Sequence, residues 1–352
     1  MTTAFPTART PNPLDAPPLR WGVLAPGRIA AAFVTAVSRY TRQRVVAVGS
    51  RSLDRAQAFA AAHGIDRAVG SYAELVDDSA VDVVYIASPH SEHATQAQLA
   101  ISAGKPVLVE KAFARNAAEA QRVVAAARDA RVPAMEAMWT RFLPQTDVIA
   151  QLLADGALGE VTTVLADHGQ YFTPDPQSRL FAPALAGGAL LDLGVYPISF
   201  ASFVLGAPDA VVAAGSRTDA GVDAQVSMAL VTGSAQACLN TTLLARTPTT
   251  ASISGTAGSL EISGPFYAPA TLTLTTTEGR SVRPPDPIEG HLGLCYEAAH
   301  LAQLVADGAT ESPVLPMDET VRILRTIEEI RRQVGVTYPG ELAELARPPM
   351  NT

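Results

Sequence analysis

The hydrophobic and polar positions in the first half of the chain form two kinds of alternating segment. Short apolar runs between Arg20 and about Met138 read WGVLA, RVVAVGS, VDVVYIAS, PVLVE and PAMEAM, and they alternate with helix-like stretches such as SLDRAQAFAAAHG, SEHATQAQLAISAG and NAAEAQRVVAAARDA. Near-continuous apolar strands that alternate with helices are typical of a parallel sheet covered on both faces. Ser52 is expected to cap a helix N-terminus, and Gly64 and Gly104 are expected at helix C-termini. The pattern predicts a nucleotide-type α/β domain.

The second half of the chain changes to Thr- and Val-rich runs with turn residues at short intervals. A helix is expected near Pro144–Asp155, and the runs after it are VTTVLADHGQYF, DAQVSMALVTG, SAQACLNTTLLA, TASISGTAG, SLEISG and ATLTLTTTEG. Two helical patterns, GLCYEAAHLAQLVADG and DETVRILRTIEEIRRQVG, follow these runs. This texture predicts a largely antiparallel sheet. We therefore expect an α/β protein with a flexible tail over residues 1–18, the nucleotide-type domain over 19–141, and an α+β domain with a large, mostly antiparallel sheet over 142–352.

The composition excludes several classes of protein. Of the 352 residues, 48% are hydrophobic and 17% are charged, which is enough for sizeable cores and excludes a disordered or fibrous chain. The net charge of −8, from 26 basic and 34 acidic residues without a Lys/Arg-rich run, argues against a nucleic-acid partner. The chain has no uninterrupted apolar stretch of about 18 residues, and its N-terminus lacks the apolar core of a signal peptide. Because Cys238 and Cys295 alone make neither a disulfide framework nor a zinc cluster, we expect a soluble cytoplasmic protein without a membrane contact or a metal.

The first apolar strand runs directly into the sequence APGRIA, at the position of the G-x-G-x-x-G/A fingerprint of a βαβ unit. Gly27 stands where the backbone approaches a pyrophosphate, and Ala30 stands where the helix packs close to the strand. Ala25 replaces the first glycine, which is a mild change if the turn needs no positive φ. The helix start at Arg28 and Ile29 would offer free N–H groups to the phosphates. An ordinary strand-to-helix turn is the alternative, but the position on the first strand favours a Rossmann domain that binds a dinucleotide.

The second strand ends in the sequence VGSRS, where a site for NAD usually carries an acidic residue that binds the ribose 2′-hydroxyl. This chain has no acidic residue there. Ser50 and Ser52 can donate hydrogen bonds, and Arg51 can pair with a phosphate. These residues favour NADP over NAD. The alternative is that Arg51 is an ordinary surface residue, because all but two of the 26 basic residues are arginines.

Two further strands bring reactive side chains to the same edge of the predicted sheet. The fourth strand ends in IASPHSEH and the fifth in VEKA, and open α/β sheets place ligands at the carboxyl ends of their strands. Lys111 is therefore expected in the cofactor crevice. It and Lys105 are the two lysines of the chain, and a lysine, unlike an arginine, can have its pKa tuned for proton transfer. His90 and His93 begin the next helix, where a histidine is more often a cap or a packing residue than a catalyst.

The sequence GGALLDLGVYP carries a second candidate pair in the α+β domain. Asp192 and Tyr196 are spaced i, i+4 and share one face if this segment is helical. Pro197 disfavours the α region at the residue before it, so a kinked or early helix turn is expected. Asp and Tyr at this spacing carry little specificity alone, and an ordinary surface face of a helix is the alternative.

Taken together, these motifs resemble those of the Gfo/Idh/MocA oxidoreductases from about Arg20 to Glu341. The matching stretches are WGVLAPGRIA, IASPHSEHA, AGKPVLVEKA, MEAMWTRFLP and GGALLDLGVYP. Tyr196 stands where the family often has histidine. With MWTRF and VTYPGE, it makes the chain most similar to the branch of dimeric dihydrodiol dehydrogenases, glucose–fructose oxidoreductases and NADP-linked xylose dehydrogenases. Ala112 replaces the proline that usually follows the family's lysine, so the backbone at Lys111 is less restricted than in a typical member.

The resemblance implies hydride exchange between the nicotinamide C4 and a carbinol carbon of a sugar, polyol or cyclic diol. The catalytic residues would be Lys111, Tyr196 and Asp192, with Tyr196 as the proton shuttle. Because a free phenol has a pKa of about 10, the Lys111 ammonium is expected to lower the pKa of Tyr196. The predicted cofactor-binding residues are Ala25, Gly27, Arg28, Ile29, Ser50, Arg51, Ser88, Pro89, His90, His93, Glu110, Lys111, Trp139 and Arg141. The predicted substrate-binding residues are Lys111, Trp139, His168, Phe172, Asp192 and Tyr196, and Arg141, Tyr171 and Arg179 are also expected to face the cleft.

The resemblance also implies a homodimer or higher homo-oligomer that associates through the second-domain sheet, because a large sheet with few covering helices leaves a face to bury. Two alternatives are a redox-neutral sugar-modifying enzyme with a tightly held cofactor and a non-catalytic, cofactor-sensing regulator of the same fold. The presence of both Lys111 and Tyr196 argues against the regulator, since a sensor needs neither. The sequence names neither the particular sugar or diol nor the physiological direction of the reaction.

Overall fold

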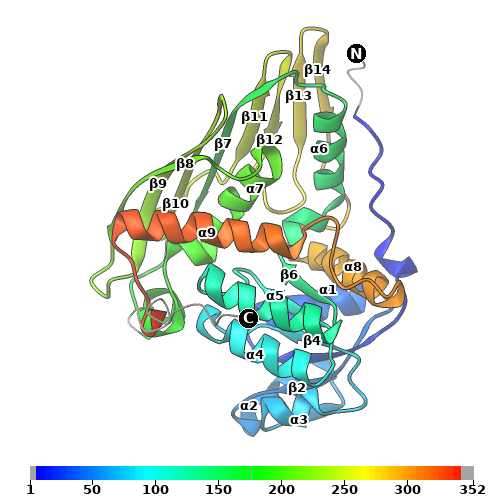
Figure 1. Ribbon diagram of the computed structural model, residues 1–352. Helices are drawn as coiled ribbons and strands as arrows, with labels where there is room; N and C mark the ends of the chain where they lie inside the picture. Colours follow the sequence, from blue (N-terminus) through cyan, green and yellow to red (C-terminus); the bar gives the residue numbers. More distant parts are fainter. Residues whose placement is uncertain (1–4, 176, 342–352) are drawn as a thin grey trace.

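The computed structural model describes residues 5–175 and 177–341, and Figure 1 shows its two β-sheets in separate layers. A short helical turn, η1 (Pro13–Asp15), precedes the first layer. That layer contains β1 (Arg20–Leu24), α1 (Arg28–Tyr40), β2 (Arg44–Gly49), α2 (Leu53–His63), β3 (Arg67–Val69), α3 (Tyr72–Val76), β4 (Val83–Ile86), α4 (His90–Ser102), β5 (Val107–Glu110), α5 (Ala117–Ala130) and β6 (Ala134–Ala137).

The first sheet is parallel, with the strand order β3-β2-β1-β4-β5-β6. Strands β4, β5 and β6 are buried along their whole length, as their continuous apolar runs predicted. The Ser52 side chain accepts a hydrogen bond from the backbone N of Arg55 at the start of α2, and Gly64 ends that helix with a left-handed φ of 66°. The strand order reverses between β1 and β4, and a ligand crevice is expected at such a switch point. The predicted Rossmann architecture is confirmed.

The second layer follows a short turn, η2 (Trp139–Phe142), and α6 (Pro144–Ala154). Its other elements are β7 (Val161–Gly169), η3 (Arg179–Phe181), η4 (Pro183–Leu185), η5 (Leu190–Gly194), α7 (Val195–Leu205), β8 (Ala210–Arg217), β9 (Asp223–Thr232), β10 (Ala235–Thr242), β11 (Ala251–Gly255), β12 (Gly258–Ile262), β13 (Leu272–Thr276), β14 (Gly279–Arg283), η6 (Gly290–Gly293), α8 (Leu294–Ala306) and α9 (Met317–Val334). The sequence pattern missed β8 and β14, which are the two edge strands of this sheet.

The second sheet has the order β14-β13-β12-β11-β7-β10-β9-β8. Its pairs are antiparallel except for β7 with β10, so the predicted mostly antiparallel sheet is confirmed. Helices α7 and α9 contact one face of the sheet. Buried and exposed side chains alternate along β9 and β10, which is the pattern of a sheet with one covered face and one open face.

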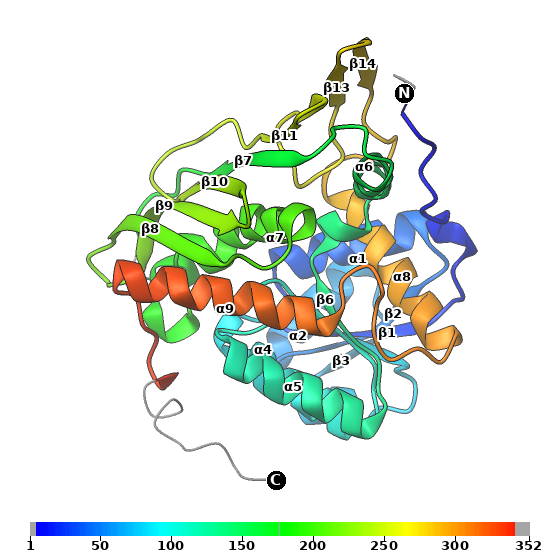
Figure 2. The same cartoon turned by 45° about the horizontal axis from the view of Figure 1, so that its top comes forward.

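The last two helices of the chain return to the first layer. Helix α8 packs against α1, and α9 packs against α5 as well as against β8. Figures 1 and 2 both show α9 crossing between the two sheets. The division expected near residues 141 and 142 therefore separates the two sheets, while helices from the second part also cover the first.

Residues 5–18, expected to lie in a flexible tail, make polar contacts with both parts of the molecule. Arg9 forms an ion pair with Asp147 of α6 at 2.7 Å, and Gln151 of the same helix donates a hydrogen bond to the Thr7 carbonyl at 2.9 Å. Gln43, before β2, donates a hydrogen bond to the Pro17 carbonyl at 2.7 Å. The segment has no apolar periodicity, so the sequence pattern carried no signal of these contacts.

The most apolar helical stretch lies inside the fold. By length and composition alone, Pro183–Leu205 could cross a membrane, with a mean hydropathy of 1.6. However, 78% of its most apolar window is buried within the protein, and helix α7 in this stretch packs on β7 and β10. The hydrophobicity of this stretch is explained by its place in the core.

Candidate active site

A cleft of about 990 Å³ opens at the carboxyl ends of the parallel strands, where the second layer faces the first. The structure brings most of the predicted residues to its wall. Those that line it are Ala25, Gly27, Arg28, Ile29, Ser50, Arg51, Ser88, Pro89, His90, Glu110, Lys111, His168, Phe172, Asp192 and Tyr196. Arg179, which was expected to face the cleft, also lines it.

Three residues predicted to bind the cofactor, Arg141, His93 and Trp139, do not line the cleft. Arg141 is buried, and its guanidinium pairs with Glu319 at 2.9 Å, because η2 turns this side chain toward α9. His93 is fully buried, and its two ring nitrogens face backbone carbonyls of residues 88 and 112. Trp139 lies behind Tyr196 and contacts it through a hydrogen bond. Tyr171, also expected in the cleft, is exposed and lies outside the lining.

The fingerprint loop differs from the expectation at Ala25. Its φ is +72°, so the turn does require the left-handed conformation that glycine adopts without strain. The replacement is therefore not the mild change that the sequence suggested. Gly27 has an extended backbone, and a Cβ built on it would meet no atom within 4 Å. The open space beside Gly27, together with the uncapped start of α1, fits a bound pyrophosphate.

Basic side chains gather at the end of β2. Arg51 and Arg28 line the cleft there, as predicted, and Arg55 from the first turn of α2 joins them. The Arg55 guanidinium lies 3.5 Å from the Pro26 carbonyl, so it reaches back to the fingerprint loop. Ser50 Oγ accepts a hydrogen bond from the backbone N of Ser52 at 3.2 Å. The motif at the strand end did not include Arg55, because this residue reaches the cleft from the first turn of α2.

Lys111, Asp192 and Arg179 form a charged group at the opposite end of the cleft. Lys111 Nζ donates a hydrogen bond to the Asp192 carbonyl at 2.7 Å and lies 3.8 Å from its carboxylate. Arg179 donates to the same carboxylate at 2.8 Å. Burial opposes the charge of Asp192, but the two cations outweigh it and hold the pKa of Asp192 well below its usual range. The group therefore carries two positive charges and one negative charge.

Tyr196 comes from the second layer and meets Lys111 at this point. Its hydroxyl accepts a hydrogen bond from Trp139 Nε1 at 3.0 Å, and Lys111 Nζ lies 5.0 Å from the centre of its ring. Burial raises the pKa of Tyr196 well above the usual value, and the nearby Glu110 adds to the increase. The pKa of Tyr196 is therefore raised rather than lowered as expected, and the Lys111 ammonium is hydrogen-bonded to the Asp192 carbonyl.

Aromatic rings continue the wall beside Tyr196. Tyr267 stacks on Tyr196 at 4.7 Å and on His168 at 4.6 Å. Burial lowers the pKa of His168 to about 4, so the ring is neutral at pH 7. Its Nδ1 faces the Leu193 carbonyl at 3.2 Å, which places the proton on that nitrogen. The sequence analysis did not find the other residues of this wall, Gln170, Leu180, Leu185, Tyr267 and His291, because they come from loops without a recognisable motif.

The local backbone explains why Asp192 and Tyr196 point into the same space. Asp192 lies in the π-helical turn η5, and Tyr196 lies in the first turn of α7 directly after it. A π-helical turn of this kind often marks a functional site. Pro197 is the third residue of α7, and because η5 runs directly into α7 with αR backbone at Gly194 and Val195, the proline lies inside a continuous helical stretch. The buried Asp223 carboxylate accepts a hydrogen bond from the backbone N of Leu190 at 2.5 Å and so holds the start of the turn.

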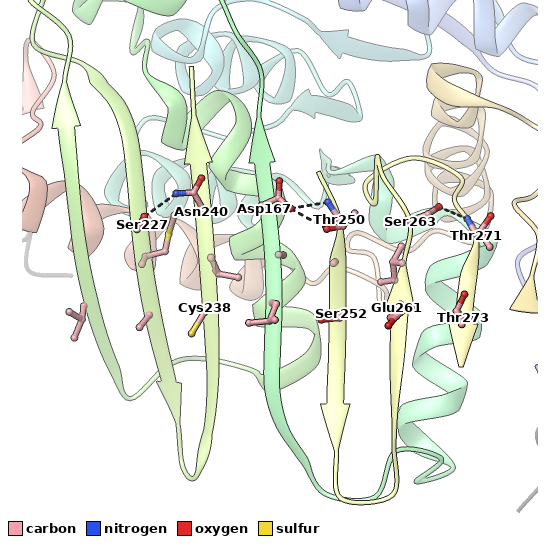
Figure 3. Close-up of a pocket in the computed structure, with 18 of the residues that line it drawn as sticks. Asp167, Ser227, Cys238, Asn240, Thr250, Ser252, Glu261, Ser263, Thr271 and Thr273 are labelled. Atoms are coloured by element: carbon pink, nitrogen blue, oxygen red, sulfur yellow. Dashed lines mark hydrogen bonds between the residues drawn. The ribbon is translucent and has the colours of Figure 1, made fainter. Parts of the chain in front are cut away.

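A second cavity, of about 960 Å³, lies on the open face of the large sheet (Figure 3). Its lining comes from the strands and shares no described residue with the cleft. Short side chains such as Cys238, Ser227 and Ser252 dominate it, and Figure 3 shows Asp167 bonded to Thr250 across two strands. In the described part of the chain, no group of three or more His, Cys, Asp or Glu side chains could hold a metal ion at either place.

Comparison with known proteins agrees with this architecture. An oxidoreductase family with an NAD-binding Rossmann fold matches residues 19–138, and the Gfo/Idh/MocA C-terminal domain matches residues 147–261. The chain is 37% identical over 332 residues to trans-1,2-dihydrobenzene-1,2-diol dehydrogenase from Homo sapiens, which covers 92% of this chain and 99% of that protein. The corresponding enzyme from Sus scrofa is 38% identical over 333 residues, with the same coverage.

The chain therefore belongs to the Gfo/Idh/MocA family, in the branch that contains these dihydrodiol dehydrogenases, and the resemblance seen in its motifs is confirmed. It is an oxidoreductase with an NAD(P)-binding Rossmann domain. Among solved structures, it is similar to an aldose–aldose oxidoreductase from Caulobacter crescentus in complex with glycerol, with a TM-score of 0.81, 27% identity, and coverage of 91% of this chain and 98% of that one. A 3-ketoreductase from Actinomadura kijaniata in complex with TDP-benzene and NADP gives a TM-score of 0.77 at 27% identity, with coverage of 90% and 98%.

Proposed function

We propose that this protein is an NADP(H)-dependent oxidoreductase that transfers a hydride between the nicotinamide and a carbinol carbon of a diol or sugar. The observation that carries the proposal is the meeting of Lys111 and Tyr196, from different layers, in one cleft with the fingerprint loop. A structural surface needs neither a lysine nor a phenol beside a dinucleotide loop. The names of the related proteins support a diol or a sugar as the substrate.

When bound, the nicotinamide supplies or accepts the hydride. Tyr196 holds the proton that the substrate oxygen gains or loses. Because its pKa is raised, the phenol is protonated at pH 7 and ready to donate a proton in the direction of reduction. Lys111 is held by Asp192 close to the ring and can donate a hydrogen bond to the substrate oxygen. Because the Asp192 carboxylate also pairs with Arg179, its single negative charge does not fully neutralise the Lys111 ammonium.

The cofactor preference rests on Arg51 and Arg55. Both line the cleft at the end of β2, where no acidic side chain of the motif could bind a free ribose hydroxyl. Charge-assisted bonds from guanidinium groups suit a 2′-phosphate. The NADP in the related 3-ketoreductase structure also supports this preference. Titration of the protein with NADPH and NADH, followed by the fluorescence of the reduced nicotinamide, tests it, and tighter binding of NADH would overturn it.

The substrate end of the cleft combines rings with hydrogen-bonding groups. Tyr267, His168 and Phe172 provide flat surfaces for a ring, and Gln170 and Arg179 provide donors for hydroxyl groups. This combination suits a cyclic diol or a pyranose. A screen of sugars, inositols and trans-dihydrodiols with NADP⁺, measured by the absorbance of the reduced nicotinamide, identifies the class. If none of these compounds is turned over, the proposal is contradicted.

A redox-neutral reaction is the second candidate, because the related Caulobacter crescentus protein is named an aldose–aldose oxidoreductase. Such an enzyme would oxidise one sugar and reduce another with the same bound cofactor. Product formation without a lasting change in nicotinamide absorbance would favour it. The non-catalytic regulator is disfavoured by the presence of Lys111 and Tyr196 together.

We also propose that the open face of the large sheet associates with a second copy of the chain, as a homodimer or a higher homo-oligomer. Leu165 and Val212 lie on this face with 48% and 64% of their surface exposed. Apolar side chains of a sheet face that no helix covers are the usual material of a two-fold interface. A monomer at micromolar concentration by light scattering would refute the interface. The cytoplasmic location stays part of the proposal, supported by the free thiols of Cys238 and Cys295.

A further inference from the structure

The segment 336–341, with the sequence VTYPGE, follows α9 and lies outside the lining of the cleft. Three of its residues are nevertheless buried: Val336 is 2% exposed, Tyr338 is 3% exposed and Glu341 is 4% exposed. Gly335 ends α9 with a left-handed φ of 71° and turns the chain back toward the protein. In Figure 1 the red end of the described chain lies beside the green segment that leads into α7.

A buried ion pair fixes this segment to α9. The Arg331 guanidinium donates hydrogen bonds to the two carboxylate oxygens of Glu341 at 2.8 and 3.2 Å. The backbone N of Tyr338 donates to the same carboxylate at 2.8 Å, and Arg331 lies over the Tyr338 ring at 4.4 Å. The segment is thus a small ordered unit rather than a loose end.

This unit has two bonds to the Rossmann layer. Asn116 Nδ2 donates to Glu341 Oε1 at 3.1 Å, and Arg115 Nη1 donates to the Pro339 carbonyl at 2.9 Å. Asn116 caps α5 through its side-chain oxygen and ends the short connection that begins at Lys111. The segment therefore holds the far end of the connection that carries Lys111.

It has one bond to the second-layer half of the site. The Tyr338 hydroxyl donates to the Gly187 carbonyl at 2.8 Å. Gly187 is closely surrounded, because a Cβ on it would lie 2.5 Å from the Arg179 carbonyl. Gly187 thus packs against the backbone of Arg179 and lies three residues before the start of η5, which carries Asp192.

We propose that the segment 336–341 is a positioning clamp that aligns the Lys111 half of the site with the half that carries Arg179, Asp192 and Tyr196. No residue of the clamp lines the cleft, and the clamp acts through Asn116 on one side and Gly187 on the other. Its role in turnover rests on the proposed oxidoreductase function. The reason for such a device is that the reacting groups come from different layers, and a displacement of about 1 Å between them can reduce catalysis by roughly 10².

The first test is the variant Tyr338→Phe, which keeps the ring and removes the bond to Gly187. We expect kcat to fall by roughly tenfold, with the affinity for NADPH unchanged within about twofold, because the clamp aligns groups at the nicotinamide end only. The matched control is Thr41→Val, which removes a buried hydroxyl that donates to the Val37 carbonyl in α1, away from the clamp. Equal effects of the two variants on kcat would overturn the proposal.

The second test needs no turnover and uses amide hydrogen exchange of the full chain. If the clamp couples the two halves, Tyr338→Phe increases exchange in residues 187–193 and also in residues 111–116 of the other layer. An increase confined to residues 187–193 overturns the coupling. Should Tyr338→Phe not fold, Asn116→Ser keeps an N-cap oxygen, loses the bond to Glu341 and gives the same two readouts. Coupled exchange in a protein that does not turn over any diol or sugar would support the clamp and contradict the proposed function instead.

Discussion

The cleft and the cavity on the sheet face have nearly equal volumes, about 990 and 960 Å³, but their walls differ in chemistry. The cleft collects Lys111 from a strand end of the first layer, and Arg179, Asp192 and Tyr196 from helical turns of the second. The sheet-face cavity is lined by strand residues of one layer, mostly small or hydroxyl-bearing. Convergent groups with shifted pKa values therefore distinguish a reaction site from a surface that suits association, and volume does not.

The largest expected effect comes from the phenol in the cleft. Tyr196→Phe keeps the ring and removes the proposed proton donor, so turnover should fall by roughly 10²–10⁴ with little change in cofactor affinity. Lys111→Met should cost at least as much, and the double variant should be little worse than the more affected single variant, because the two act as one unit. Steady-state kinetics measures this, with Tyr296→Phe on α8 as the control outside the cleft. Near-normal turnover of Tyr196→Phe would assign the proton transfer to another group.

The pH dependence of the two directions should differ because the pKa of Tyr196 is raised. Oxidation needs the deprotonated phenol, so its rate at low substrate should increase by close to tenfold per pH unit from neutral pH toward the pKa. Reduction needs the protonated phenol and should be nearly independent of pH over the same range. Initial rates in both directions check this expectation. An oxidation rate that is already independent of pH at neutrality would mean that the phenol ionises more easily than its burial implies.

The adenosine end of the cleft should respond to charge. Replacement of Arg51 by Ala should weaken NADPH binding by roughly 10- to 100-fold and should change NADH binding much less. The expected loss corresponds to about 1.5–3 kcal/mol, the free energy of a charge-assisted hydrogen bond. Arg55→Ala should act in the same direction. Fluorescence titration of both variants with both cofactors gives the comparison, and equal losses for NADPH and NADH would remove the assignment of a 2′-phosphate site.

A change on the sheet face should affect assembly and leave the chemistry intact. Leu165→Glu places a charge on the open face and should dissociate a dimer, while kcat per subunit stays within about twofold. Light scattering and steady-state kinetics on the same sample check both parts. Loss of turnover with the dimer intact would show that the cleft and the sheet-face cavity are not independent of each other.

The smallest expected effect concerns the fingerprint turn. Ala25 adopts a left-handed φ of +72°, which costs an alanine roughly 1 kcal/mol more than a glycine. Ala25→Gly should therefore increase the free energy of unfolding by at most about 0.6 kcal/mol, after the entropy cost of glycine, about 0.4–1 kcal/mol, is subtracted. Urea denaturation measures this free energy of unfolding. Ala31→Gly in the interior of α1 is the control, and it should lower the free energy of unfolding.

The sequence by itself determined the features that depend on neighbouring residues. The alternation of apolar runs and helix-like stretches predicted the parallel sheet, and the motif positions placed Gly27, Arg51 and Lys111 at strand ends that face one crevice. The spacing of Asp192 and Tyr196 placed them on one helical turn. Strand ends of a parallel sheet lie at a common edge whatever the rest of the fold does, so these placements needed no distant contact.

Only the tertiary structure decided the properties that depend on distant segments. Arg141 carries the same charge as Arg51 in the sequence, but η2 turns it toward Glu319 and away from the cleft. Tyr267 and His291 reach the wall from loops that follow the motifs by many residues. Burial, with the nearby Glu110, reversed the expected shift of the Tyr196 pKa. Side-chain direction, burial and the distance between charges are set by the packing of elements far apart in the chain, and a local pattern of residue types does not contain them.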